Sequence, residues 1–425
     1  MLSLPVEILD LFVDHIDDSS EEGMKTLGAC MLSSKTLFFR ARGRIFSTID
    51  LDRDTDHEGL KELLEYQAAN YPPLLPSIKT LEVRWRREWL EENNTRPEER
   101  EGMIDILFLL ATPTSRIWNL KFNFSREQLP DLGPKDKTYR AMRAIFSIPT
   151  VQSLHLLFGR NIPAEMFDIF MLRKLRLHMV EFNFKALLST IATAPSAISN
   201  CVNPATRFRQ LSVLYPIHLP SIWKRSSTSP FGSLQSLVVR LGYIRKCHSD
   251  LDFGNLLSIS QHSLKNLRVY LCADLLRSYP HTLQPLKSLL TLTYVLRSSP
   301  AYPSRERMTD WNVESLLESL ATLNDAPNSL QHIAIHLNVH LDKIIPQNIQ
   351  FKDDQQRKDL LDALSSPRFA TVANIKILVQ VASMGSMIDV DVPFLVDFPL
   401  QTKIDYPRIK VTTRRFRGFI DEEDS

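Results

Sequence analysis

One arrangement of hydrophobic and polar positions recurs along most of the chain: apolar, two variable residues, apolar, one variable residue, apolar. The last two apolar positions alternate with a period of two, which is typical of a short β-strand with one buried face. Each copy therefore predicts one strand. The ten copies are Ile78/Leu81/Val83, Ile117/Leu120/Phe122, Val151/Leu154/Leu156, Leu172/Leu175/Leu177, Phe208/Leu211/Val213, Leu234/Leu237/Val239, Leu264/Leu267/Val269, Leu289/Leu292/Tyr294, Leu330/Ile333/Ile335 and Val372/Ile375/Ile377.

Stretches with helical spacing separate these strands. They are Leu60–Ala69, Met103–Ala111, Tyr139–Ile148, Ala164–Phe170, Val313–Leu323 and Lys358–Leu364. A strand, a helix and a return to the next strand resembles the leucine-rich-repeat plan, in which parallel strands line the inside of an arc. The repeat is irregular, and the consensus Asn after the strand is mostly absent.

We therefore predict an α/β fold, an irregular leucine-rich-repeat-like solenoid over residues 51–383 with its strands on the concave face and its helices outside. Residues 384–425 are expected to form a C-terminal cap, with strands at Val390–Phe398 and Ile404–Val411, and an acidic tail. The alternative is a doubly wound α/β domain, which also alternates strands and helices.

The first fifty residues have a different pattern. Pro5 suits the first position of a helix, and Glu7 is favoured in its first turn. Ile8, Phe12 and Ile16 belong to an apolar stripe at helical spacing. Two more short amphipathic helices follow. Three helices of this size cannot bury all of their apolar surface among themselves, so part of it should face a partner.

This segment resembles the F-box proteins of the fungal type. The resemblance rests on Leu4-Pro5-Val6-Glu7-Ile8-Leu9, Thr26-Leu27-Gly28-Ala29-Cys30, Leu32-Ser33-Ser34-Lys35 and the basic, aromatic Phe39-Arg40-Ala41-Arg42. The chain lacks the Trp that many F-boxes carry shortly after the Cys. The resemblance implies a three-helix F-box over residues 1–50 that binds the Skp adaptor of a cullin–RING (SCF) ubiquitin ligase. By family position the contact would be made by Leu4, Pro5, Ile8, Leu9, Leu27, Cys30, Leu32 and Leu37.

The composition is that of a globular protein, with 44% hydrophobic and 24% charged residues, and a net charge of only +2 makes general nucleic-acid binding unlikely. The four cysteines have no paired spacing, which suits a reducing compartment. The first helix lacks the pattern of a secretory signal, and no apolar run is long enough to cross a bilayer. A cytoplasmic or nuclear location without membrane attachment is expected.

No pattern of catalytic or metal-binding residues has the spacing that its chemistry needs. Asp52 begins a calcium-loop-like series, but His57 and Leu63 stand where that loop needs Gly and Glu. His57-Glu58 also begins like a zinc-protease helix, yet Lys61 occupies the place of the second His. Glycine-rich phosphate loops and nucleophile elbows are absent. The sequence therefore predicts a protein that is not an enzyme and needs neither cofactor nor metal.

Residues that flank the buried pair in each strand should point to the inner surface of the arc. Among these thirty positions, three in each of ten strands, one is a carboxylate (Glu82) and seven are basic. Seven minus one leaves +6 on this strip. The basic residues are Arg84, Lys121, Lys174, Arg176, Arg240, Arg268 and Lys376. The strip predicts a surface for an acidic or phosphorylated segment; alternatively, long basic side chains only solvate the exposed face of the sheet.

The combined expectation is a substrate-recognition subunit that docks the Skp adaptor through the F-box and an unidentified target protein through the arc. Ubiquitin transfer would belong to its partners. The alternative function is a nucleic-acid-binding or scaffold protein that uses the arc without a ubiquitin ligase. A third possibility is a stable complex with the adaptor alone, without a ligase.

Overall fold

A computed structural model describes residues 5–18, 20–52, 55–70, 74–85, 97–124, 136–159, 162–163, 172–178, 180, 182–183, 208–214, 231–241, 250–272, 283, 286–297, 313–323, 329–341, 354–383 and 406–417. The chain divides into two compact units, Met1–Thr206 and Arg207–Ser425. Each unit is described separately below.

Unit 1 begins with a helical module made of α1 (Val6–Asp14), α2 (Glu21–Ser33) and α3 (Lys35–Ile45). Ser20 and Ser34 cap the second and third helices, each accepting a hydrogen bond from a backbone N–H three residues later. The core of the module is small. It consists of Val13, Leu27, Cys30 and Ala41, with Ile16, Met31, Leu37 and Ile45 packed around them.

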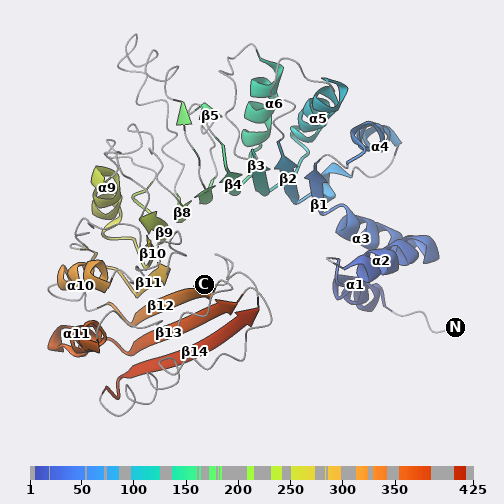
Figure 1. The fold of residues 1–425 in the computed structure, drawn as a ribbon. Helices are drawn as coiled ribbons and strands as arrows, with labels where there is room; N and C mark the ends of the chain where they lie inside the picture. The colour runs from blue at the N-terminus through green and yellow to red at the C-terminus, as the bar shows by residue number, and fades with distance from the viewer. Residues whose placement is uncertain are drawn as a thin grey trace, which may run out of the picture. The chain divides into compact units, whose positions relative to one another are not determined.

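The sheet of unit 1 contains five parallel strands in chain order. They are β1 (Thr48–Leu51), β2 (Thr80–Arg84), β3 (Asn119–Asn123), β4 (Ser153–Leu157) and β6 (Lys174–His178). The helices α4 (His57–Asn70), α5 (Pro97–Leu110) and α6 (Lys137–Phe146) lie side by side along one face (Figure 1). Smaller elements are the 3₁₀ helix η1 (Leu75–Ser77) and the paired β5 (Ile162–Pro163) and β7 (Phe182–Asn183).

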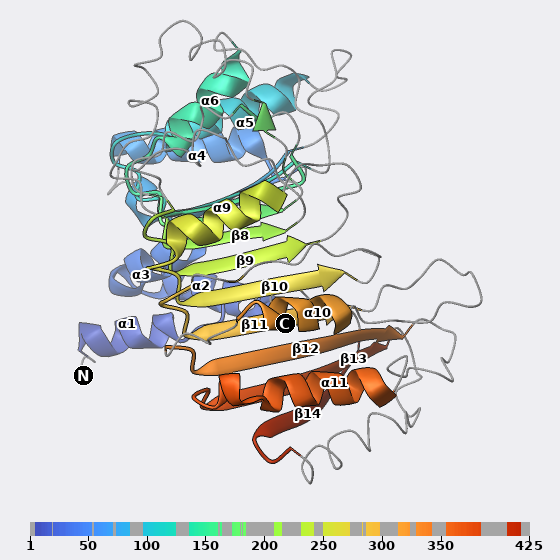
Figure 2. The same cartoon turned by 90° about the vertical axis from the view of Figure 1, so that its left-hand side faces the viewer.

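Unit 2 repeats this plan with longer strands. All run parallel and pair in chain order: β8 (Gln210–Leu214), β9 (Ser236–Leu241), β10 (Asn266–Cys272), β11 (Thr291–Arg297), β12 (His332–Leu341), β13 (Asn374–Ser383) and β14 (Ile409–Arg417). Figure 2 shows α9 (Asp250–Ser260), α10 (Val313–Ala321) and α11 (Asp354–Ser365) on the face turned to the viewer. The 3₁₀ helix η5 (Pro367–Phe369) precedes β13.

The strands confirm the repeat pattern. In each of the ten apolar triplets the last two residues lie on a strand and the first lies two residues before it. The middle residues form continuous buried rows: Leu81, Leu120, Leu154 and Leu175 in unit 1, and Leu211, Leu237, Leu267, Leu292, Ile333 and Ile375 in unit 2. Within each unit the strand order follows the chain without reversal, which is compatible with a solenoid-like α/β fold. A doubly wound sheet reverses its order at a switch point.

Some elements differ from the sequence prediction. Strand β1 and helix α9 were not predicted, and β14 lies five residues later than the expected strand at Ile404–Val411. β1 joins the sheet by pairing in parallel with β2 over four residues, so the sheet begins directly after the helical module. The predicted helix at Ala164–Phe170 and strand at Val390–Phe398 lie outside the described residues.

Candidate interaction surfaces

The helical module exposes an unusual amount of apolar surface. Ten large apolar side chains are exposed in the part of the chain that the structure describes, and seven of them lie in α1, α2 and α3. These seven are Val6, Ile8, Leu11, Phe12, Met24, Leu32 and Phe39. Leu32, at the C-terminal end of α2, is 91% exposed. Soluble proteins rarely gather large apolar side chains on their surface without a partner to cover them.

Helix α1 explains part of this exposure. Its apolar stripe is wider than the small core of the module can cover. Val13 is fully buried in the core, whereas Ile8 and Phe12, one helical turn apart on the edge of the stripe, are about half exposed at 48% and 58%. Leu11 lies beside them at helical spacing and is also exposed. These three residues give α1 an outward apolar face.

The eight residues expected to contact an adaptor occupy different depths. Pro5, Ile8 and Leu32 are exposed, and Leu9 and Leu37 are half-buried. The expected contact set is corrected at Leu27 and Cys30. Both belong to the core of the module, and Leu27 has no exposed surface. They support the helices from within. Leu4 lies outside the described residues.

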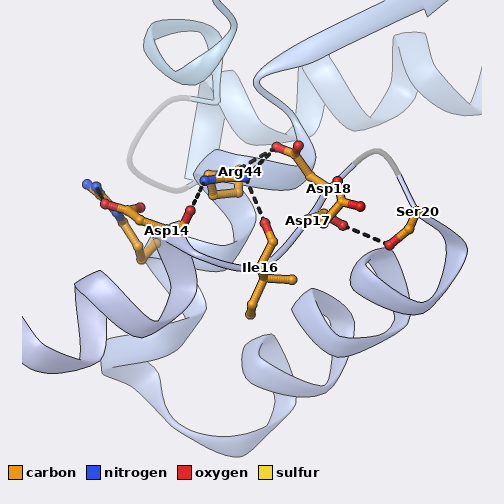
Figure 3. A network of polar contacts seen from close by, with 7 residues as sticks. Asp14, Ile16, Asp17, Asp18, Ser20 and Arg44 are labelled. Atoms are coloured by element: carbon orange, nitrogen blue, oxygen red, sulfur yellow. Dashed lines mark hydrogen bonds and ion pairs between the residues drawn. The ribbon is translucent and has the colours of Figure 1, made fainter.

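Two arginines of α3 hold α1 and the turn that follows it. Arg40 forms a two-pronged ion pair with the Asp14 carboxylate. Arg44 donates to the Asp18 carboxylate and to the backbone oxygens of Asp14, at 2.7 Å, and Ile16, at 2.9 Å (Figure 3). The hydrogen bond from Arg40 holds the pKa of the Asp14 carboxyl below its usual value. The exposed face of α1 is therefore held in a fixed orientation.

The outward face of the unit 1 sheet is charged but not uniformly basic. One register row reads Asp50, Glu82, Lys121, His155 and Arg176 across five strands. Lys121 pairs with Glu82 at 3.1 Å, and Arg84 pairs with Asp50 at 2.9 Å and lies 3.8 Å from Asp52. Burial is the largest influence on Asp50 and raises the pKa of its carboxyl.

These pairs correct the predicted basic strip. The prediction counted one carboxylate, but Asp50 of β1 and Asp52 in the turn that follows β1 lie in the same region. Lys174 and Arg176, at the β6 end of the row, are half-buried and already engage neighbouring groups. The alternation of Ile49 and Leu51, both buried, is the sequence signal that could have revealed β1 and its carboxylates.

Unit 2 keeps a cationic region at the start of its strands. Across β9 to β14, the two register rows on the face away from the buried leucines carry no carboxylate. The rows are Ser236, Asn266, Thr291, His332 and Asn374, followed by Val238, Arg268, Thr293, Ala334, Lys376 and Lys410. Arg268 and Lys376 are half-buried and Lys410 is exposed. We call the second of these rows the cationic row.

Arg240 differs from the other predicted target-binding residues. It is only 8% exposed and engages other groups, so it belongs to the interior. Tyr270 and Val295 share its register row and are buried as well, so both faces of the sheet are covered at this level. The prediction assumed one open face along the whole strand.

Within the described ranges, no group of three or more His, Cys, Asp or Glu side chains is placed to hold a metal ion. Asp52 accepts from Thr55 and lies near Arg84, as part of a turn after β1. The same part of the chain contains no helix with the length and apolar character needed to cross a membrane. Neither a scan against protein-family models nor a search of curated proteins returns a match for this chain.

Proposed function

We propose that this protein is the substrate-recognition subunit of an SCF-type cullin–RING ubiquitin ligase, acting in the cytoplasm or nucleus. In this proposal residues 1–46 form an F-box that docks the Skp adaptor. The remaining chain forms a leucine-rich-repeat-like arc that holds a target protein. The protein itself catalyses nothing, and it brings the target's lysines to a high local concentration near the ubiquitin-charged partner.

The observation that carries the proposal is the concentration of exposed apolar side chains on the helical module, in the segment whose sequence resembles an F-box. A module with a core of four buried apolar residues is not expected to leave seven large apolar side chains in water unless a partner covers them. Burial of apolar surface is the dominant favourable contribution to most protein–protein association. An adaptor with a complementary apolar groove would therefore bind mainly through this surface.

The proposed adaptor contact consists of the exposed members of the expected set, Pro5, Ile8 and Leu32, extended by Leu11 and Phe12. Leu27 and Cys30 hold the helices together beneath them. The ion pairs Arg40–Asp14 and Arg44–Asp18 hold α1 in place before the partner binds. This lowers the entropy cost of docking.

The target is proposed to bind the cationic row of unit 2, through Arg268 and Lys376. These two residues keep the role expected from the sequence, because they lie on a face whose two register rows carry no acidic side chain. Arg84 and Lys121 do not keep it, because they are neutralised by carboxylates of neighbouring strands.

The first test is co-expression with a Skp adaptor, with the amount of adaptor that co-purifies measured for two variants. The double change Ile8→Glu and Leu32→Glu places charges in the proposed contact and is expected to abolish co-purification, with the circular dichroism spectrum unchanged. The matched control is Trp118→Glu, which changes an apolar side chain that is equally exposed (48%, as for Ile8) but lies next to β3. A wild-type protein that ignores the adaptor, or a double variant that still retains it, would contradict the proposal.

A further inference from the structure

The last strand of unit 2, β14, has a long edge that no other described strand covers. β14 pairs with β13 over nine residues, and β13 is its only neighbour among the described strands. An open edge of this length, about 30 Å, offers a row of unpaired backbone N–H and C=O groups. β1, which ends the sheet of unit 1, is four residues long and offers far less.

The composition of β14 gives this strand a net positive charge. The strand reads Ile-Lys-Val-Thr-Thr-Arg-Arg-Phe-Arg, with four basic residues and no acidic one. Its exposed Lys410 stands directly in register with Lys376 of β13, and the cationic row continues to Arg268. Like charges side by side on neighbouring strands repel each other, and an anion lying across them relieves this repulsion. The same charge also keeps two copies of the edge from pairing with each other.

The register shows which backbone groups face the open side. Asn266, His332 and Asn374 share one row, and each donates its backbone N–H to the preceding strand, at 2.9–3.0 Å. Main-chain groups of successive residues point to opposite neighbours. On β14, Lys410 and Thr412 stand in register with the residues two and four positions after Asn374, so their main-chain groups bond to β13. Val411 and Thr413 alternate with them and turn their N–H and C=O groups toward the open edge.

We propose that β14 binds an extended acidic segment of another protein by strand addition. The segment's backbone would pair with Val411, Thr413 and the residues that alternate with them. On one face of the segment, its carboxylates would lie beside Lys410, at the β14 end of the cationic row. This binding mode requires a polypeptide backbone, which distinguishes it from general attraction to polyanions such as nucleic acid. The proposal does not depend on adaptor docking, since the helical module belongs to unit 1.

The test uses the full-length protein and a fluorescent seven-residue peptide that alternates valine and glutamate, with binding followed by fluorescence anisotropy at low salt. Thr413→Pro removes one backbone donor from the open edge, and an edge strand tolerates proline at such a position. Thr413→Ala, the matched control, keeps the donor. We expect Thr413→Pro to weaken binding about tenfold and Thr413→Ala to leave it unchanged.

A second readout needs no variant. The same peptide with N-methyl groups on alternate amides keeps its charge but loses half of its backbone donors, and should bind about tenfold more weakly to the wild-type protein. A peptide with lysine in place of glutamate should not bind. The proposal is overturned if the acidic peptide does not bind, or if N-methylation has no effect. It is also overturned if single-stranded DNA of equal charge competes while Thr413→Pro changes nothing, because the edge would then be a general polyanion surface.

Discussion

Arg44 shows how much of the helical module depends on a single side chain. Its guanidinium donates to one carboxylate and two backbone oxygens in the turn between α1 and α2. Replacing it with alanine leaves both backbone acceptors without their partner. We expect Arg44→Ala to lower the free energy of unfolding of the module by about 1–3 kcal/mol, measured by urea denaturation.

Arg40→Ala is the matched control, because Arg40 lies one turn earlier in α3 and pairs with the side chain of Asp14 rather than with backbone oxygens. A surface pair of this kind contributes about 0–1 kcal/mol. Equal destabilisation by the two variants would show that the backbone contacts of Arg44 contribute little.

At the scale of single residues, the sequence predicted which charged residues lie on the outward face of the sheet, but not which residues they pair with. Arg84 and its carboxylate partner Asp50 are 34 residues apart in the chain, and Lys121 and Glu82 are 39 apart. Such pairs exist only because the strands align in one particular register, which sequence spacing does not specify. The burial of Arg240 could not be predicted either, because it depends on how the row it shares with Tyr270 and Val295 is covered.

At the scale of elements, hydrophobic periodicity predicted the ten central strands because their two buried positions alternate and are preceded by a third. β1 was missed although Phe46, Ile49 and Leu51 have the spacing of the other ten triplets, because this stretch directly follows a helix and was counted with the helical segment. α9 carries a usable signal in the spacing of Phe253, Leu256 and Leu257, all buried. The ion pairs between helices, like those between strands, could not be predicted from the sequence.

One such charge links the three helices of unit 1. Asp105 on α5 pairs with Lys137 of α6 and Lys61 of α4, each at 3.0 Å, and hydrogen bonds from Lys137 and then Lys61 lower the pKa of its carboxyl. Because the pKa is lower in the folded than in the unfolded state, the carboxylate stabilises the fold at pH values above about 4. This contribution is lost as the pH falls through the folded-state pKa.

We therefore expect Asp105→Asn to lower the urea midpoint at pH 7 and to have a smaller effect at pH 3, because protonation of the wild-type carboxyl removes the ion pairs as the pH falls. Far-ultraviolet circular dichroism at the two pH values measures the difference. Glu62→Gln on exposed α4 surface is the control, and it should change neither midpoint. A destabilisation by Asp105→Asn that does not depend on pH would contradict the ion-pair explanation.

At the scale of the whole molecule, the sequence predicted a helical segment of 50 residues, one solenoid and a cap. The two compact units do not follow those boundaries, because compactness depends on contacts between distant segments that no local pattern reports. The helical module ends at Ile45, and β1 already belongs to the sheet. The place to separate docking from target binding is therefore before Ser47, whose backbone oxygen accepts from Lys79 and Thr80.

This boundary gives a paired prediction for two N-terminal deletions. Removing residues 1–46 should abolish adaptor co-purification and leave the urea midpoint of the remaining chain close to that of the full protein. Removing residues 1–52 also deletes Ile49 and Leu51, which are 5% and 0% exposed, and leaves Arg84 without its carboxylates. The lost burial should cost about 3 kcal/mol or more, since each such side chain contributes roughly 1.5–3 kcal/mol. Adaptor binding by either deletion would place the docking surface outside the helical module, and equal stability of the two would show that β1 is not part of the folded sheet.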